Sequence, residues 1–592
     1  MFTQSDRAPR AHWIGLAALF FAAQSQAITV GPDSDPNCQF HDVTSAVIAA
    51  DQAPGLDLVQ ISAGTYTGVS SMTIASGDDI IVEGGFADCS AGISTGTSTL
   101  DATGAVIPGS LFAHAGVGKL TLLHLVLQNS STVAGGGVYS DGTGALVLSD
   151  VRLQSNFADF GGGIFAIGAP GSHKQITMTG TQFNSNIARG DGGGIYAVFA
   201  DITIGSGRPS YFLGNFANGM ASSGHGDGAG AYLLNSNLNV HAHGVAGSPF
   251  IGENRAARFG GGIYFGTDQP NAYQLYLEND SANQPLEISY NSGIAGGGIY
   301  FDADSSDQID VFAHFRNTIW RENHATYGAA VHVESLGTGP FSVATSIHFE
   351  QTSAGDGTPP CPYGMRCNLL ESNLAQSGYI VSASSGGPGG STAIYFNRGS
   401  MIDNHTIDGG GGLIFCGTCV LEADSSLFAR NALSGDVLGV VAGALRVRNS
   451  TIAHNTVGAE QLFTVALVPS TVEIAHSLLT QPNDPVAAYL VGAGIPVDSH
   501  DNGVESVALT GTNVQNLFDP YVDANGGDFH IRTTSSAVDR WAASGNPNDP
   551  APTVDLDGAV RPYVFNSPAE PYDFGAYEAG SEPDTIFRDG FD

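Results

Sequence analysis

Lysine is nearly absent from this chain of 592 residues, which contains only Lys119 and Lys174. Lysine and arginine together number 20 against 56 aspartates and glutamates, so the formal net charge at pH 7 is -36. Proteins that bind nucleic acid neutralise its phosphates with a basic surface, which this composition lacks. The sequence therefore excludes nucleic acid as a partner. The acidity favours solubility, with bound calcium as the alternative explanation.

The chain also lacks any uninterrupted apolar run of about 18 residues, the length that a membrane-spanning helix needs. The shorter run WIGLAALFFAA, at residues 13–23, follows two arginines and precedes QSQA, which ends at Ala27. This arrangement is typical of a cleaved secretory signal over residues 1–27. We therefore expect a secreted or extracellular protein with no transmembrane segment after cleavage and a mature chain that starts near Ile28.

Cysteine is scarce, with six residues in the whole chain. In an exported protein this small even number favours disulfides over metal or redox chemistry, although six cysteines allow fifteen pairings. Proximity in sequence favours Cys361 with Cys367 and Cys416 with Cys419, which leaves Cys38 with Cys89. The CGTC stretch at 416–419 has the spacing of a redox motif, but it lies in a glycine-rich β pattern without a βαβ context.

Glycine, in contrast, is abundant, with 80 residues, and it forms part of a recurring pair of motifs. An apolar residue stands three places before an asparagine at eleven positions, which are spaced 24 to 50 residues apart. These asparagines are Asn129, Asn156, Asn186, Asn215, Asn254, Asn291, Asn323, Asn373, Asn404, Asn431 and Asn455. A glycine-rich step such as FGGGIF or DGGGIY follows seven of them. A repeat of this length is typical of solenoids.

The segments between these motifs have the periodicity of strands. Stretches such as LVLSDVRL from Leu146 place aliphatic residues at every second position, and residues 55–515 show no sustained helical periodicity. Parallel stacking of such units predicts an all-β, right-handed parallel β-helix solenoid. The apolar residue then fills the interior, the asparagine tolerates a left-handed backbone and stacks on the next coil, and the glycines permit a corner at positive φ.

The two ends of the chain depart from the repeat. The stretch CQFHDVTSAVIAADQ has apolar residues at helical spacing, so residues 28–60 are predicted to form an N-terminal cap whose helix covers the open end of the solenoid. The β-helix is expected over residues 61–515. A region rich in proline and aspartate follows at 516–580 and should fold back over the last coils, and residues 581–592 form a C-terminal tag.

The paired motifs resemble the repeats of the polymorphic outer-membrane protein family, among the parallel β-helix proteins of the pectin-lyase-like class. This resemblance covers roughly residues 120–460 and implies surface exposure and adhesion. The C-terminal region resembles that of secreted bacterial β-helix proteins with a choice-of-anchor region, in which DxDGxxRP precedes DxGAYE. The matching residues are Asp555, Asp557, Gly558, Arg561 and Pro562, then Asp573, Gly575, Ala576, Tyr577 and Glu578. The closing DTIFRDGFD is similar to tags on exported proteins of gammaproteobacteria, which implies sorting or secretion in a Gram-negative bacterium.

An aromatic side chain follows most glycine steps at a position that should face outward. The column comprises Tyr139, Phe165, Tyr196, Tyr232, Tyr264 and Tyr300, and it ends at His332. An exposed stripe of this kind would bind a sugar or a protein partner, since large apolar patches are uncommon on soluble monomers. The alternative is that the rings stabilise one sheet or are covered by an insertion.

Polysaccharide lyases and glycosidases use this fold class, so a catalytic cluster has to be considered. A lyase needs a base beside carboxylates or calcium, and a hydrolase needs two carboxylates on one face. The best local candidate is HFRNTIWRENH, whose catalytic residues would be Arg316, Arg321, Glu322 and His324. The alternative is that these are solvated turn residues.

Two patterns could hold a metal. The first, if calcium binds, comprises Asp302, Asp304, Asp307 and Asp310; Asp307 stands where an EF-hand loop needs glycine, so only an irregular site is compatible. The second is the pair His241 and His243 on one side of a strand, for which no third ligand is evident.

These patterns together predict a secreted or surface-associated monomer that binds a polysaccharide or a cell-surface glycan in the manner of an adhesin, without catalysis. A polysaccharide lyase or glycoside hydrolase is the alternative. The RGD tripeptide at 189–191 lies between an asparagine corner and a glycine corner, and coil geometry explains it better than recognition by an integrin.

Overall fold

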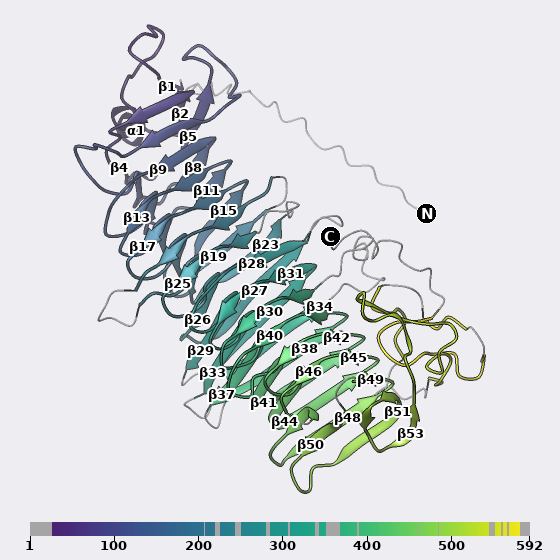
Figure 1. The fold of residues 1–592 in the computed structure, drawn as a ribbon. Helices are drawn as coiled ribbons and strands as arrows, with labels where there is room; N and C mark the ends of the chain where they lie inside the picture. Colours follow the sequence, from purple (N-terminus) through teal and green to yellow (C-terminus); the bar gives the residue numbers. More distant parts are fainter. Residues whose placement is uncertain are drawn as a thin grey trace, which may run out of the picture.

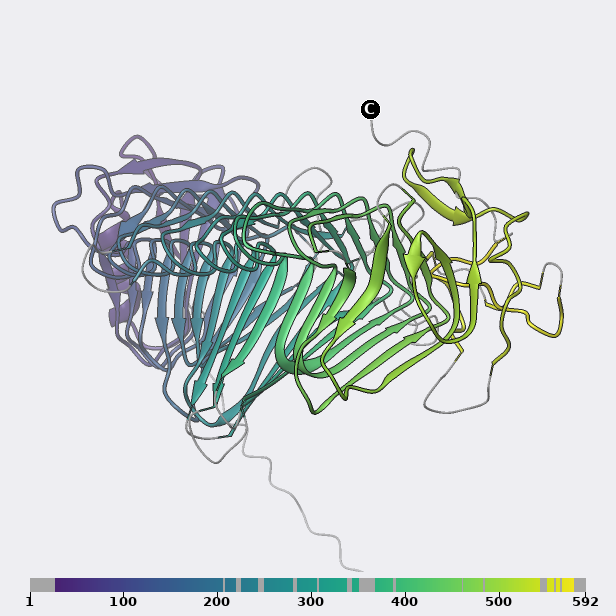
Figure 2. The same cartoon turned by 60° about the horizontal axis from the view of Figure 1, so that its bottom comes forward.

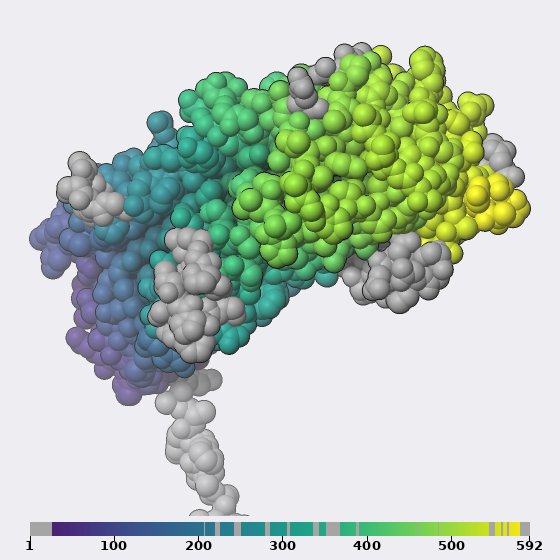
Figure 3. All heavy atoms as spheres, turned by 90° about the horizontal axis from the view of Figure 1, so that it is seen from below, coloured from purple at the N-terminus to yellow at the C-terminus, as the bar shows by residue number. Residues whose placement is uncertain are grey.

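The computed structural model describes residues 27–579 except for 206–207, 220–224, 243–249, 280–284, 306–307, 338–342, 351–367, 387–389, 460, 483–484, 544–550, 558–560 and 565–566. Parallel strands stack coil upon coil into an elongated β-helix, as the repeat predicts (Figure 1). The chain advances along the long axis from one end to the other, so that neighbouring coils in space are neighbours in sequence (Figure 3). The predicted signal sequence, tag and Cys361–Cys367 pair lie outside the described residues.

Each coil contributes a strand to each of three parallel sheets, which run side by side along the solenoid (Figure 2). The first sheet, which follows the glycine steps, contains β4 (Met72–Ile74), β7 (Phe112–His114), β10 (Val138–Ser140), β14 (Ile164–Ile167), β18 (Ile195–Val198), β22 (Ala231–Leu234), β26 (Ile263–Thr267), β29 (Ile299–Ser305), β33 (Val331–Gly337), β37 (Val381–Gly386), β47 (Gln461–Val465), β50 (Val486–Val491) and β52 (Val507–Ala508).

The second sheet contains β1 (Ile28–Val30), β2 (Asp57–Ser62), β5 (Ile80–Phe86), β8 (Leu120–Leu123), β11 (Leu146–Ser149), β15 (Lys174–Thr179), β19 (Ala200–Ile204), β23 (Asn237–Ala242), β27 (Asn271–Asn279), β30 (Ile309–Arg316), β34 (Val343–Glu350), β38 (Gly390–Asn397), β48 (Ser470–Ala475), β51 (Val497–Glu505) and β53 (Thr512–Asn516). Two long strands, β41 (Ile414–Asp424) and β44 (Leu438–Arg448), pass from the first sheet into the second.

The third sheet leads into the asparagine corner and contains β3 (Gly64–Thr67), β6 (Ser98–Asp101), β9 (Leu125–Gln128), β12 (Arg152–Gln154), β16 (Gln182–Asn184), β20 (Tyr211–Leu213), β24 (Ile251–Gly252), β28 (Leu286–Ser289), β31 (Thr318–Arg321), β35 (Leu369–Glu371), β39 (Ser400–Ile402), β42 (Leu427–Ala429), β45 (Thr451–Ala453) and β49 (Leu478–Thr480). Short strands follow the corner: β13 (Phe157–Ala158), β17 (Ile187–Ala188), β21 (Phe216–Ala217), β25 (Arg255–Ala256), β32 (His324–Ala325), β36 (Leu374–Ala375), β40 (His405–Thr406), β43 (Ala432–Leu433) and β46 (Thr456–Val457).

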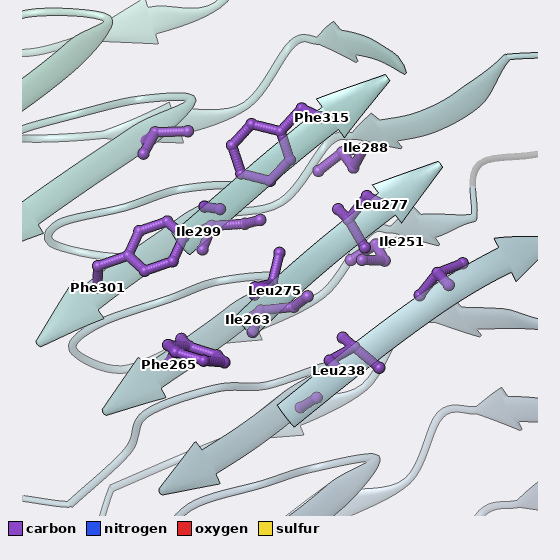
Figure 4. Close-up of a cluster of buried hydrophobic side chains, with 14 of the residues drawn as sticks. Leu238, Ile251, Ile263, Phe265, Leu275, Leu277, Ile288, Ile299, Phe301 and Phe315 are labelled. Carbon is purple, nitrogen blue, oxygen red and sulfur yellow. The ribbon is translucent and has the colours of Figure 1, made fainter. Parts of the chain in front are cut away.

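Inward and outward side chains alternate along each strand and fill the interior with matching rows. In β30, for example, Val311, Ala313 and Phe315 are buried while the residues between them face outward. Rows from different sheets meet in the middle of the coil, as Ile263 of the first sheet and Leu275 of the second do in Figure 4. A cavity of about 10 Å³ beside Ala231 interrupts this packing. It has room for about one water, so it is too small for an organic ligand.

The asparagines of the repeat form a continuous hydrogen-bonded ladder inside the corner, and they are buried from Asn156 to Asn455. Each side chain from Asn156 to Asn431 uses Nδ2 to donate to the Oδ1 of the next asparagine, at 2.8–3.1 Å. The same Nδ2 donates to the carbonyl of the apolar motif residue one coil earlier, as Asn254 does to Phe212 at 2.9 Å. The motif thus places an apolar side chain in the core and pairs the polar groups beside it.

Two details of the predicted corner are wrong. The left-handed residue is the one immediately before the asparagine, as at Ser185 (φ 52) and Glu253 (φ 57), because the ladder asparagine itself has to point inward. The first match, Asn129, is one residue out of register: it is exposed, and Ser130 occupies the ladder and donates its N–H to Asn156 Oδ1 at 3.1 Å. The glycine corner is as predicted, since the first glycine of the step has positive φ, as at Gly192 (φ 70).

One of the two lysines lies inside the solenoid. Lys174 is 1% exposed, and its Nζ donates to the carbonyls of Gly142, at 2.7 Å, and Gly144. Burial lowers the pKa of Lys174 to about 8, and burial together with this lysine lowers the pKa of His114 to about 4. Both shifts follow from the low polarity of the interior, which disfavours charge.

The N-terminal end is capped as predicted by a helix, α1 (Val43–Gln52). Asp42 caps it by accepting a hydrogen bond from the Ser45 N–H at 2.8 Å. The buried face of α1 packs against β1, β2, β4 and β5. The disulfides Cys38–Cys89 and Cys416–Cys419 are both present, as the sequence predicts.

The region after residue 516 folds back onto the outer face of the third sheet, in agreement with the prediction. It includes the antiparallel pair β54 (Tyr521–Asp523) and β55 (Asp528–Ile531). Trp541, Phe574 and Tyr577 pack in one buried cluster with Leu427 and Leu478 of the solenoid.

The two tail motifs meet in a buried ion pair. The side chains of Arg561 and Glu578 are 0% exposed, and Nε lies 2.8 Å from Oε2. The same guanidinium donates to the carbonyls of Gly575 and Tyr577, at 2.8 and 3.0 Å. Gly575 has φ 95, and a Cβ there would lie 2.6 Å from Thr451 Oγ1. The tail motifs therefore fasten this region to β45.

Candidate functional site

The aromatic residues after the glycine steps form a continuous stack. Successive ring centroids from Tyr139 to His332 lie 4.7–5.7 Å apart and the rings are nearly parallel. Identical register in the first sheet produces this spacing, because Tyr232, for example, pairs with Tyr196 and Tyr264. The predicted order of the column is therefore what the structure contains.

The predicted exposure of this column is wrong at its C-terminal end. Tyr264 is 7% exposed and Tyr300 only 2%. Two phenylalanines that precede glycine steps fold over the rings: Phe259 stacks on Tyr300 at 4.6 Å, and Phe160 lies against Tyr196 at 5.5 Å. The corner thus turns its preceding residue back over the sheet. Tyr139, Phe165, Tyr196 and Tyr232 remain half-buried.

Two buried tyrosines of the column donate their hydroxyls to carboxylates. Tyr264 donates to Asp302 Oδ2 at 2.6 Å, and Tyr300 donates to Glu334. Burial raises the pKa of Asp302, because it removes the charged form from water. Burial likewise raises the pKa of Tyr196 to about 12. The two hydroxyl–carboxylate hydrogen bonds thus join side chains on adjacent strands of the first sheet.

The residues predicted to bind calcium are spread over two sheets. Asp302 and Asp304 lie on β29 of the first sheet, and Asp310 lies on β30 of the second, while Asp307 lies outside the described residues. Among described residues, two groups bring three ligand atoms within 4.8 Å of one another, Asp35–Cys38–Cys89 and His476–His500–Asp501, and neither includes these aspartates. Calcium stays a prediction. His241 is 45% exposed beside Glu278, and His243 lies outside the described residues.

The residues predicted to be catalytic occupy three elements, β30, β31 and β32, and the corner between the last two. Arg316 Nη1 lies 3.7 Å from Glu278 Oε1. Arg321 ends β31, where its Nε lies 3.0 Å from Glu371 and its Nη1 3.8 Å from Glu287.

The other two predicted catalytic residues lie at and after the corner. Glu322 is the left-handed corner residue (φ 50), and His324 is exposed on β32. Arg316 and Arg321 each pair with glutamates of neighbouring strands. The catalytic role of the four residues stays a prediction.

The RGD tripeptide does not form a protruding loop. Arg189 pairs with Asp159 of the previous coil. Asp191 is 3% exposed and accepts hydrogen bonds from the N–H groups of Gly226 and Asp227, at 2.7 and 3.0 Å. Coil geometry accounts for this tripeptide, as the sequence favours.

The outer face of the second sheet carries a band of aligned rings and charges, which we call the second-sheet band. Its residues are Tyr276, Glu278, His314, Arg316, His348, Glu350, Tyr395, Glu422, Arg446 and Glu473. Tyr276, His314, His348 and Tyr395 occupy one register, and their successive ring centroids lie 5.1, 4.6 and 4.5 Å apart. The strands that carry the band lie side by side from β27 to β48 (Figure 2).

Charged side chains flank these rings and pair across the strands. Arg316 lies between the strands of Glu278 and Glu350, and Arg446 lies 3.4 Å from Glu422 and 3.9 Å from Glu473. The hydrogen bond from His348 lowers the pKa of Glu350, and burial together with His348 lowers the pKa of His314. At neutral pH the band therefore presents the ionised carboxylate of Glu350 beside the neutral imidazole of His314.

Sequence reasoning missed most of this band, although a signal is present. The tripeptides YLE at 276–278, HFR at 314–316, HFE at 348–350 and YFN at 395–397 repeat one pattern: a ring, an interior apolar residue and a polar group. The coils between them differ in length, so the pattern has no fixed period. The pairing of neighbouring strands brings the four tripeptides into one row on the sheet.

The three sheets, the asparagine ladder and the glycine corner define a parallel β-helix repeat protein. Residues 180–198 match the Chlamydia polymorphic membrane protein repeat. This segment contains the interior Phe183, the ladder residue Asn186 and the glycine corner at 192–194, so the match covers one asparagine corner and one glycine corner. It fits the observed β-helix and points to a bacterial surface or outer-membrane protein. No curated protein matches the chain. In the part of the chain that the structure describes, no helix is long and apolar enough to cross a membrane.

Proposed function

We propose that this chain is a bacterial surface-associated protein that binds a polysaccharide along the second-sheet band. The observation that carries the proposal is the alignment of four rings with flanking carboxylates and guanidinium groups on one outer face. The outward edges of the stacked rings supply apolar area for a sugar, and charged groups supply strong hydrogen bonds to hydroxyls. The match to a surface-protein repeat supports the location.

The charges of the band favour a neutral polysaccharide over a polyuronate. Its carboxylates, on Glu278, Glu350, Glu422 and Glu473, outnumber the three guanidinium groups that pair with them, on Arg316, Arg446 and Arg448. An anionic polymer would meet a net negative surface on a chain whose total charge is -36. Like charges facing each other weaken association. From β27 to β48 the band spans six strand spacings, or about 29 Å, which is suited to a polymer rather than a monosaccharide.

The test is binding of the full chain to neutral polysaccharides, with polygalacturonate as the anionic comparison, measured by affinity electrophoresis and calorimetry. Tyr395→Ala should weaken binding about tenfold, which corresponds to about 1.4 kcal/mol. Tyr139→Ala, at the half-buried end of the aromatic column, is the matched control and should bind as the wild type does. Thermal unfolding of both variants shows whether the coils remain intact.

The aromatic column is the second candidate surface, because Tyr139 and Phe165 stack at 5.3 Å and are half-buried. Weaker binding by Tyr139→Ala, with Tyr395→Ala unaffected, would move the site to that column. Failure of every neutral polysaccharide to bind would refute the proposal.

A further inference from the structure

Three side chains on the outer face of β34 are joined in a chain of hydrogen bonds. His348 lies at the centre: its Nε2 is 2.6 Å from Ser346 Oγ, and its Nδ1 is 2.8 Å from Glu350 Oε1. Strand geometry brings them together, because residues two and four places apart project from the same face. All three are half-buried, so they are held in place while remaining open to the outer surface.

The direction of each hydrogen bond follows from the charge of Glu350. The bond from His348 holds the pKa of Glu350 below its usual range, so this carboxylate is ionised at neutral pH and can only accept. Nδ1 of His348 therefore carries a proton, and in the neutral form of the imidazole Nε2 has a free electron pair. Ser346 Oγ–H must then donate to Nε2, which makes the histidine a base for that hydroxyl.

The imidazole is also fixed in orientation by its neighbours in the band. His348 lies between His314, at 4.6 Å, and Tyr395, at 4.5 Å between ring centroids. A base that is clamped on both faces does not have to be ordered when the reaction occurs, which lowers the entropic cost of reaching the transition state.

We propose that Ser346, His348 and Glu350 form a serine esterase centre that cleaves O-acyl groups from the bound polysaccharide. Nucleophile, base and carboxylate have the same hydrogen-bond order, through the same ring nitrogens, as the triads that cleave esters on unrelated folds. In register with Ser346 lie Phe312, which is 39% exposed, and the small Ala393. They place an apolar side chain and a small one beside the hydroxyl, which suits a small acyl group. The polysaccharide part of the substrate rests on the proposed function, whereas the chemistry at Ser346 does not.

The reaction proceeds in two balanced steps. Ser346 Oγ attacks the ester carbonyl while its proton moves to His348 Nε2; the bond to the sugar oxygen then breaks, and that oxygen takes the proton. Water next attacks the acyl-serine, gives a proton to Nε2 and releases the carboxylic acid, as the serine hydroxyl takes that proton back. Glu350 stabilises the imidazolium that forms in each step.

The negative oxygen of the tetrahedral intermediate needs a donor from a side chain. The N–H groups of β34 belong to the ladders with β30 and β38. His314, on the adjoining strand, is neutral because burial lowers its pKa, and it offers one ring N–H. One donor supplies less stabilisation than a pair, so reporter esters with good leaving groups are the sensitive probe.

The experiment treats the full chain with a fluorophosphonate probe and with p-nitrophenyl acetate, and maps the labelled peptide by mass spectrometry. We expect an adduct on Ser346 and ester turnover, both of which Ser346→Ala abolishes. Glu350→Gln should lower turnover at least about 100-fold, whereas Glu350→Asp, which keeps the charge, should restore part of it. Ser382→Ala is the matched control, because Ser382 is also bonded to a histidine, His332 Nδ1, at 2.6 Å, but in the first sheet.

Three outcomes would overturn the proposal or a defined part of it. An unlabelled Ser346 in a folded wild-type chain refutes the catalytic centre. Equal loss of turnover in Glu350→Asp and Glu350→Gln refutes the role of the carboxylate. Turnover of p-nitrophenyl acetate without release of acetate from acetylated xylan refutes the polysaccharide ester as substrate; if Tyr395→Ala still weakens binding to xylan, the proposed binding function stands separately.

Discussion

Removal of one ladder asparagine is the sharpest perturbation that the fold offers. In Asn254→Ala the missing side chain takes away four hydrogen bonds. Its Nδ2 donates to Phe212 O and to Asn291 Oδ1, both at 2.9 Å, and its Oδ1 accepts from the N–H and the Nδ2 of Asn215, both at 3.0 Å. All three asparagines are buried, so no water replaces the lost partners.

The expected cost follows from these four bonds. A net contribution of about 1 kcal/mol for each gives about 4 kcal/mol, and the buried donors left on Asn215 increase it further. Urea unfolding followed by circular dichroism measures the change through the shift of the midpoint. The matched control is Asn129→Gly, at the motif asparagine that lies outside the ladder. Its side chain makes one bond to Asp101, at 3.1 Å, and glycine is chosen because φ there is 59.

Asn129→Gly should cost less than about 1 kcal/mol. If Asn254→Ala shifted the unfolding midpoint no more than this control does, the ladder would contribute nothing beyond an ordinary surface contact, and its assigned role would be refuted.

Three further changes test other parts of the fold. Glu578→Gln removes the carboxylate that pairs with the buried Arg561, which should cost about 3–5 kcal/mol. It should also expose residues 517–579 to limited proteolysis while the coils stay intact. An unchanged digestion pattern would contradict the attachment of this region through Arg561 and Glu578. Burial lowers the pKa of Lys174 to about 8, so between about pH 8 and 10 the unfolded chain holds more protons and stability rises with pH. Lys174→Met should be more stable at pH 7 and lack this rise, and an unchanged pH slope would count against it. Ala231→Val fills the small interior cavity and should add up to about 1 kcal/mol, unless a lower melting temperature shows that the site is already full.

The sequence predicts the coil well because each coil repeats the same local physics. An apolar residue is favoured in the interior of a β-helix, an asparagine in the ladder and a glycine step at the corner with positive φ. Helix α1 and the two described disulfides follow from similarly local signals. The one-residue shift at Asn129 could not be seen, because Val126 and Leu127 are both apolar and only stacking on the next coil selects Leu127.

The sites were harder to predict because they depend on contacts between coils. The rings of the aromatic column are aligned as expected, but their burial depends on how Phe259 turns at the corner before the step. His314 and His348 are 34 positions apart and meet only through strand register. The Ser346–His348–Glu350 arrangement, in contrast, lies within one strand and could have been recognised from alternate positions alone.

The apolar outer face of the third sheet sets an order of events during synthesis. Leu369, Leu427 and Leu478 point away from the coil and are covered by residues 517–579, which a ribosome makes later. Each new coil can pack on the previous coil as it emerges. These leucines, however, stay exposed to solvent until residues 517–579 have been made and have folded over them. A nascent chain interrupted near residue 500 would hence be nearly complete in coils and still prone to aggregate. Residues 517–579 therefore protect the newly made chain from aggregation and also stabilise the complete fold.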